Sequence, residues 1–295
     1  MSLFLDAGKA VLIQGITGRA AARHAEYMRE YGTGVVAGVA PGRGGRTVGG
    51  VPVFDTVAGA VEATGARTSV AFLPPGAVGD GLVEAAEAGI ELCVSVTEGV
   101  PLHDVLDGLE AAGHNGMRVI GPNCPGVLSA GRYLLGFLPA AITVPGPVAV
   151  LARSGTLSYE AVHALARHGV GVSLWAGVGG DRVKGSAFAD LLPDVLDDPR
   201  TEALVLVGEI GGTDEEDVAA LLDGRGLPAV ALLAGASAPE GIALGHAGAI
   251  IEGGVGTVEG KRLRLEEAGI PVVRRPSEIP VALTRRGLAR TGAAL

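Results

Sequence analysis

AVLIQGITGRAAARHAEYMREY, residues 10–31, is the stretch that decides the fold. Residues 10–14 are almost entirely apolar, residues 15–18 contain two glycines, and residues 19–31 form an amphipathic run. A short strand without a polar face belongs inside a sheet that is covered on both sides. The segment therefore predicts a buried parallel strand, a tight turn and a helix, in that order.

The same pattern repeats along the whole chain. Short apolar runs alternate with amphipathic runs up to residue 120, and the alternation restarts near residue 148 after a stretch rich in turns and prolines. Strands that alternate with helices form parallel sheets with helices on both faces. We therefore expect an α/β protein with two doubly wound parallel-sheet domains. They are a Rossmann-like domain over residues 1–125, a linker over residues 126–146 and a flavodoxin-like domain over residues 147–295.

The composition narrows the class of protein. Glycine accounts for 49 of 295 residues and is spread among apolar runs, and the net charge is −9. An acidic chain without a basic face does not fit nucleic-acid binding, and no apolar run reaches the ~18 residues that span a bilayer. No signal-peptide pattern is visible, and two cysteines are too few for a disulfide framework. We expect a cytoplasmic protein that binds neither nucleic acid nor a membrane.

The turn after the first strand suits a phosphate-bearing ligand. Free N–H groups at a helix N-terminus bind phosphate, and Gly15 and Gly18 permit a close approach. The dinucleotide fingerprint G-x-G-x-x-G is absent, and the strand at residues 35–40 ends without the acidic residue that binds a nicotinamide ribose. A basic glycine loop around Arg43 follows instead. This pattern disfavours an NAD-dependent oxidoreductase and favours a ligand richer in phosphate, with a plain structural turn as the alternative.

Three loops of the second half carry polar groups at strand ends. Ser154 has the position of an N-cap, and the amides of Gly155 and Thr156 after it would form a second phosphate cradle. Glu209 stands among glycines, where its carboxylate could either orient an imidazole or belong to a surface loop. His246 lies in a glycine-rich segment and is either a nucleophile or a hydrogen-bonded core histidine.

One cysteine follows the strand at residues 118–120. Cys124 lies next to Asn123 in a rigid loop with two prolines, and no histidine is adjacent to it in the sequence. A cysteine without a visible base is more often inert than nucleophilic. No metal site is expected, because the histidines show no metal-ligand spacing.

Four motifs together resemble the alpha subunits of succinyl-CoA synthetases (succinate–CoA ligases), in the order of that family and over essentially the whole chain. The motifs are GPNCPG at residues 121–126, SGTL at 154–157, GEIGG at 208–212 and GHAGAI at 245–250. The resemblance implies a phosphoryl relay. An NTP phosphorylates a histidine of this chain, the phosphoryl group passes to succinate, and the CoA thiol attacks the resulting acyl phosphate.

The resemblance also implies roles for individual positions. His246 matches the phosphorylated histidine, and Glu209 matches the carboxylate that holds it. CoA contacts are implied at Thr17, Gly18, Arg19, Ala20, Arg43, Val96, Thr97 and Glu98. Contacts to the acid substrate or the phosphoryl group are implied at Ser154, Gly155, Thr156, Tyr159, Asn123 and Cys124. Mg-NTP is expected on an ATP-grasp beta subunit, in an αβ or α2β2 assembly, and the chain contains no Walker loop of its own.

Two other functions fit the same resemblance. A paralogous ligase would keep the phosphohistidine but use another short carboxylate, such as malate. A non-catalytic regulatory protein would keep the fold and CoA binding without using His246. The chain has Val255 where the family usually has lysine. This replacement removes a positive charge near the expected path of the phosphoryl group, so the identity of the acid substrate stays open between succinate and another short carboxylate.

Overall fold

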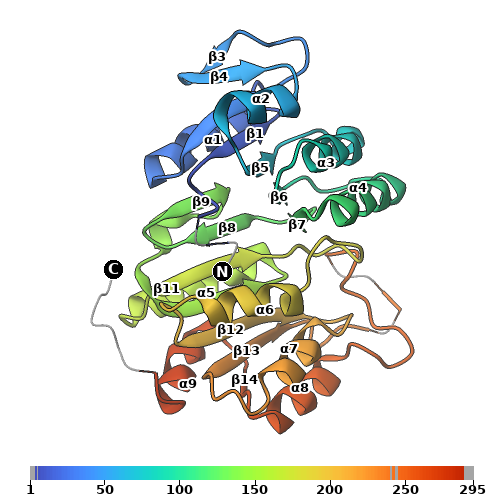
Figure 1. Ribbon diagram of the computed structural model, residues 1–295. Coiled ribbons are helices and arrows are strands. Elements are labelled where there is room, and N and C mark those ends of the chain that lie inside the picture. Colours follow the sequence, from blue (N-terminus) through green and yellow to red (C-terminus); the bar gives the residue numbers. More distant parts are fainter. Residues whose placement is uncertain (1–3, 5, 240, 243–244, 289–295) are drawn as a thin grey trace. The chain divides into compact units, whose positions relative to one another are not determined.

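The computed structural model describes residues 4, 6–239, 241–242 and 245–288. These residues form two compact units, each built on its own mainly parallel sheet (Figure 1). One unit runs to Leu138 and includes Val183–Ser186, and the other comprises Pro139–Arg182 and the chain from Ala187 onward. The predicted α/β class with two doubly wound domains is confirmed.

The first unit has a Rossmann-like strand order. Its strands run β3-β4-β2-β1-β5-β6-β7, and all are parallel except β3. The order reverses at β1, so the loops after β1, β2 and β5 lie at one carboxyl edge, where doubly wound sheets bind ligands. The strands are β1 (Val11–Gln14), β2 (Val35–Val39), β3 (Thr47–Val48), β4 (Val51–Phe54), β5 (Thr68–Ala71), β6 (Leu92–Ser95) and β7 (Arg118–Ile120). The helices are α1 (Arg19–Tyr31), α2 (Val57–Thr64), α3 (Val78–Glu87) and α4 (Leu102–Asn115).

Parallel strands of the second unit follow the flavodoxin-like order β14-β13-β12-β10-β11. The order reverses at β10, so the loops after β10 and β12 begin at adjacent strand ends. The strands are β10 (Pro145–Ala152), β11 (Val172–Gly177), β12 (Ala203–Glu209), β13 (Ala229–Ala234) and β14 (Val272–Val273). The helices are α5 (Gly155–Arg167), α6 (Phe188–Asp197), α7 (Asp214–Leu222), α8 (Val258–Glu267) and α9 (Ile279–Arg285).

An antiparallel hairpin lies within the stretch 126–146 that the sequence predicts as a linker. β8 (Gly126–Ser129) pairs with β9 (Tyr133–Gly136), and both strands are buried. The hairpin belongs to the first unit, whose limit falls after Leu138. The prolines that suggested a linker stand before β8 and after β9. None of these prolines lies within β8 or β9, so they remove no hydrogen bond from the ladder of the hairpin.

The central strands are buried along their length, as their apolar sequences predict. Every residue of β1 and of β12 is buried, which requires covering layers on both faces of the sheet. Such strands place functional groups only at their ends, in the loops. None of the described helices has the length and apolar character needed to cross a membrane.

Candidate active site

The carboxyl edge of the second sheet brings a histidine to a carboxylate. β12 ends at Glu209, whose side chain is 7% exposed, and the glycine-rich segment returns His246 to it. His246 Nδ1 lies 2.8 Å from Glu209 Oε2 and 3.0 Å from Oε1. Because a carboxylate only accepts hydrogen bonds, Nδ1 carries the proton, and the neutral ring keeps its lone pair on Nε2. The predicted pairing of these two residues is present in the structure.

The surroundings raise the pKa of His246. The hydrogen bond to Glu209 is the largest cause, and the negative charges of Glu209 and Asp181 also raise the pKa of His246, whereas burial and the positive charge of Arg153 lower it. Gly180 makes room for the ring, because a Cβ there would lie 2.2 Å from the imidazole Cγ. Among the described residues, no three His, Cys, Asp or Glu side chains gather to hold a metal ion.

Arg153 connects the histidine loop to two strand ends. It follows β10, is buried, and its Nη2 lies 3.2 Å from Glu209 Oε1. The same nitrogen donates to the Gly248 carbonyl at 3.0 Å, and Nη1 donates to the Gly211 carbonyl at 2.5 Å. One guanidinium therefore fixes the Glu209 carboxylate relative to the loop that carries His246.

Helix α5 begins directly after Arg153. Ser154 is its N-cap, and its hydroxyl accepts the N–H of Leu157 at 3.3 Å, as predicted. Gly155 and Thr156 are the first helical residues, so their N–H groups have no partner within the helix and lie at its positive end. This terminus has the chemistry of an anion cradle.

Tyr159 lies one turn into α5. Its ring contacts Trp175 edge-on, with the ring centroids 5.5 Å apart. Burial raises the pKa of the Tyr159 phenol, so the hydroxyl is protonated at neutral pH and can donate a hydrogen bond.

The predicted CoA residues lie along the carboxyl edge of the first sheet. Gly18 caps α1, which begins with Arg19 and Ala20 directly after the turn that follows β1. Thr97 follows β6, and its hydroxyl donates to the Leu73 carbonyl in the loop after β5 at 2.6 Å. All predicted CoA residues are at least partly exposed: Thr17, Gly18, Arg19, Ala20, Arg43, Val96, Thr97 and Glu98.

Asn123 and Cys124 lie beside this edge, in the first unit. The N–H of Asn123 donates to the Thr97 carbonyl at 2.8 Å, and Cys124 Sγ lies 3.2 Å from the Ser95 carbonyl. Burial raises the pKa of the Cys124 thiol to about 12. At neutral pH the thiol is therefore protonated and has no nucleophilic character.

Three charged residues of the site were missed in the sequence: Arg153, Glu215 and Lys261. Glu215 and Lys261 form an ion pair and are both completely buried. Glu215 Oε1 accepts the N–H of Glu209 at 3.1 Å, which places the ion pair next to the Glu209–His246 dyad, the hydrogen-bonded carboxylate and imidazole described above. One weak signal exists: Lys261 is one of only three lysines among the 23 basic residues, where arginine is otherwise the rule.

Comparisons with known proteins give relatives for both units. The family described as "CoA binding domain" matches residues 6–99, and the family described as "CoA-ligase" matches residues 151–270. The chain is 47% identical to succinate–CoA ligase [ADP-forming] subunit alpha 2 of Archaeoglobus fulgidus, over 95% of this chain and 97% of that protein. It is 44% identical to the alpha subunit of the same ligase from Aquifex aeolicus, over 95% and 92% of the two chains.

A similar solved structure is that of ATP citrate lyase from Methanothrix soehngenii in complex with citrate and coenzyme A. The TM-score is 0.83 with 23% sequence identity, over 96% of this chain and 50% of that chain. The chain thus spans about half the length of that protein. The fold of this chain is therefore also present within a longer protein.

Proposed function

Because the chain belongs to the family of succinate–CoA ligase alpha subunits, we propose that with a beta subunit it converts succinate, CoA and an NTP to succinyl-CoA, NDP and phosphate. The hydrogen bond between Glu209 and His246 Nδ1 carries this proposal. It leaves Nε2 of a partly exposed imidazole as a nucleophile. The relatives of Archaeoglobus fulgidus and Aquifex aeolicus are both named ADP-forming, which supports ATP as the phosphoryl donor.

His246 carries the phosphoryl group in this proposal. Nε2 of the neutral ring bonds to the terminal phosphorus of the NTP as the bond to the NDP oxygen breaks. The positive charge that develops on the ring is stabilised by the Glu209 carboxylate at Nδ1–H. The phosphoryl group then passes to a succinate oxygen, and the CoA thiol displaces phosphate from the acyl carbon. The protein supplies orientation and charge stabilisation, which dominate catalysis of phosphoryl transfer.

The N-terminus of α5 is assigned to the phosphoryl oxygens. Ser154, Gly155 and Thr156 supply its capping hydroxyl and first N–H groups, and Arg153 ties this end to Glu209. Partial positive charge at a helix N-terminus favours an anion without covalent chemistry.

Tyr159, in the second unit, is assigned to the acid substrate. For Asn123 and Cys124, in the first unit, only the resemblance to the family supports a contact with a substrate or phosphoryl group. The protonated phenol of Tyr159 supports its part as a hydrogen-bond donor to a carboxylate.

CoA is assigned to the carboxyl edge of the first sheet. The match to a CoA binding domain over residues 6–99 supports this. The residues also fit the ligand, because the N–H groups of Arg19 and Ala20 begin α1 and have no partner within the helix, and Arg43 supplies an exposed cation. Amides and a guanidinium are the groups that bind the phosphates of a nucleotide such as the ADP portion of CoA.

Mg-NTP is assigned to a partner, a beta subunit of the ATP-grasp class in an αβ or α2β2 assembly. The naming of the curated relatives as alpha subunits supports a partner, and the sequence has no Walker loop.

Cys93 and Cys124 are both free, buried thiols. Free thiols support a reducing compartment such as the cytoplasm.

Intact-mass measurement on the complex with the beta subunit tests the function. The complex is mixed with Mg-ATP and kept at neutral to mildly basic pH, because phosphohistidine is labile in acid. We expect one phosphoryl group on this chain, discharged by succinate plus CoA and absent in His246→Asn. His103→Asn, on α4, is the matched control and should be phosphorylated normally. A folded complex that takes up no phosphoryl group would contradict the proposal. Discharge by malate plus CoA but not by succinate plus CoA would keep the relay and make malate the acid substrate.

A further inference from the structure

Lys261 and Glu215 form an ion pair inside the second unit that the proposed chemistry does not use. Lys261 lies on α8 and Glu215 on α7, and both side chains are 0% exposed. Removing two charges from water costs free energy that their attraction seldom recovers, and apolar residues of similar volume often give equal or better stability. The pair therefore needs a reason other than packing.

Both side chains bind the backbone of the turn that follows β12. Glu215 Oε1 accepts the N–H of Glu209 at 3.1 Å, and Lys261 Nζ donates to the carbonyl of Gly211 at 3.0 Å. Gly208 provides the space, because a Cβ there would lie 2.0 Å from Glu215 Oε1. The pair thus holds the turn Glu209–Gly211 at its first and its last residue.

The Gly211 carbonyl connects this pair to the proposed active site. It accepts from Lys261 Nζ and also from Arg153 Nη1, the latter at 2.5 Å. Arg153 in turn lies 3.2 Å from Glu209 Oε1. The buried pair therefore fixes the backbone of Glu209, while Arg153 fixes its carboxylate.

We propose that Glu215 and Lys261 are a positioning pair for the phosphoryl relay. They hold the turn Glu209–Gly211 so that the Glu209 carboxylate meets Nδ1 of His246, which directs Nε2 to the phosphoryl donor. This role rests on the proposed function. Neither side chain touches the reacting atoms, and both act through Glu209. Misplacement of a reacting group by about 1 Å is enough to slow a reaction roughly 100-fold.

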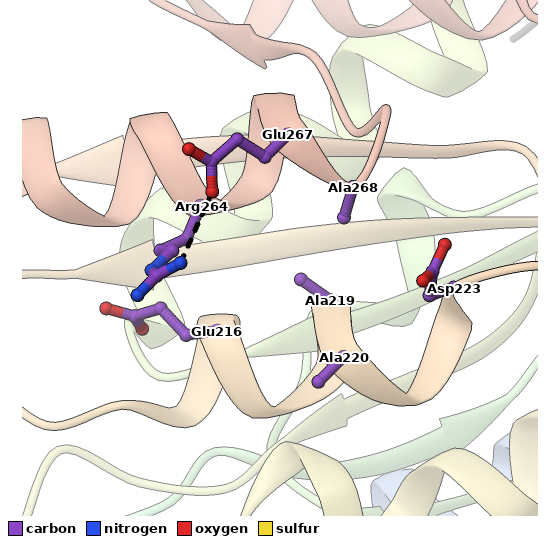
Figure 2. Close-up of a pocket in the computed structure, with 7 residues that line it drawn as sticks. All are labelled: Glu216, Ala219, Ala220, Asp223, Arg264, Glu267 and Ala268. Atoms are coloured by element: carbon purple, nitrogen blue, oxygen red, sulfur yellow. Dashed lines mark hydrogen bonds and ion pairs between the residues drawn. The ribbon is translucent and has the colours of Figure 1, made fainter.

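The outer side of the same two helices supplies a control. Figure 2 shows a pocket there, lined by Glu216 of α7 and by Arg264 and Glu267 of α8. Arg264 and Glu267 form an ion pair of 3.4 Å with both side chains mostly exposed. Exposed pairs contribute little to stability. Removing both charges of this exposed pair should therefore leave the turn Glu209–Gly211 in place.

The test compares two double variants in the complete ligase complex. Glu215→Leu with Lys261→Met removes both charges and the acceptor of the Glu209 N–H. Glu215→Gln with Lys261→Met removes the same charges but keeps an amide oxygen for that N–H. Arg264→Met with Glu267→Leu is the exposed control. Thermal unfolding identifies the folded variants, and the rate of phosphohistidine formation is then measured across pH for each.

The charged groups that face His246 are Glu209, Arg153 and Asp181, and the pair holds the backbone of Glu209. The Leu/Met variant should slow phosphorylation ~10–100-fold, as loss of an orienting outer residue does elsewhere. Its acid-side pH midpoint should also move down, because the protonated imidazole loses the carboxylate that favours it. The Gln/Met variant should recover part of both effects, because it keeps an acceptor for the Glu209 N–H but lacks the Lys261 bond to Gly211, and the control should match the parent.

A folded Leu/Met variant with the parent rate and midpoint overturns the proposal. Equal losses in both double variants with an unchanged midpoint also overturn it, because a general weakening of the fold would produce them. If the Leu/Met variant does not fold, Glu215→Met with Lys261→Met takes its place in the comparison. Failure of the proposed function is distinguishable, since the parent complex would then form no phosphohistidine at all.

Discussion

Among single residues, Glu209 governs the titration of His246. Their hydrogen bond raises the pKa of the imidazole, so the protonated ring persists to higher pH than in an ordinary histidine, whose pKa is ~6.5. Only the neutral ring has a lone pair on Nε2 for attack on phosphorus. Phosphohistidine formation should therefore increase with pH and level off only above this raised pKa.

Glu209→Gln keeps an acceptor oxygen but removes the charge. The pKa of His246 should fall, which moves the acid-side midpoint to lower pH, and the plateau rate should drop ~10–100-fold, as for other residues that orient an imidazole. Initial rates of phosphohistidine formation across pH measure both effects. Glu252→Gln is the control, because that glutamate pairs with Arg182 on the exposed surface. If the acid-side midpoint of Glu209→Gln equals that of the parent chain, Glu209 does not set the pKa of His246.

The sequence indicated some site residues and not others, for a physical reason. Glu209 and His246 stand among glycines after apolar runs, and such loops are where sheet proteins place chemistry. Glu215 lies in an acidic run at the start of α7 and Lys261 among the charges of α8. Each has the local pattern of a solvated helix face. Their burial follows from the packing of elements that are far apart in the chain, which a local pattern does not contain.

Among the elements, the first turn of α5 combines a structural and a proposed catalytic role. The Ser154 hydroxyl caps the helix by accepting the N–H of Leu157. Thr257 caps α8 in the same way, accepting the N–H of Gly260 at 3.0 Å. The two caps form a matched pair, because they have equivalent geometry and only Ser154 is assigned to the phosphoryl group.

Ser154→Ala and Thr257→Ala should each destabilise the protein by about 1 kcal/mol, the typical cost of a lost N-cap. Thermal unfolding measures this part. Ser154→Ala should in addition slow phosphohistidine formation at a temperature where both variants are folded, whereas Thr257→Ala should not. Equal phosphorylation rates in the two variants would remove Ser154 from the phosphoryl site while leaving its role as a cap.

The regular elements were predictable where period and length agree. Strands such as β1 and β12 are apolar apart from their last residues, Gln14 and Glu209, and α1 is followed by a glycine in the left-handed conformation, Gly32 with φ +113°. The hairpin β8–β9 was not predicted as strands. Its strands are short and follow a run of prolines and glycines, which by itself signals loop. Pairing between the two neighbouring strands decides their structure, and neither strand taken alone shows it.

At the scale of the whole molecule, the two proposed activities lie in different compact units. The CoA residues belong to the first unit and the His246–Glu209 dyad to the second. Arg43→Ala should weaken CoA binding about 10–100-fold, the value of one charged hydrogen bond, and leave phosphohistidine formation unchanged. His246→Asn should do the reverse. Calorimetry with CoA and intact mass with Mg-ATP measure the two properties, and loss of both in either variant would contradict this separation.

The nitrogen that carries the phosphoryl group tests the central claim most directly. In the structure Glu209 occupies the Nδ1 side of His246, which leaves Nε2 to react. Phosphorus–nitrogen correlation by NMR distinguishes the two isomers in a histidine-labelled chain that is phosphorylated in its complex and then unfolded in mild base. The result expected is phosphorylation at Nε2 of His246 alone. Phosphorylation at Nδ1, or at another residue, would contradict the role given to Glu209 and to the charged pair behind it.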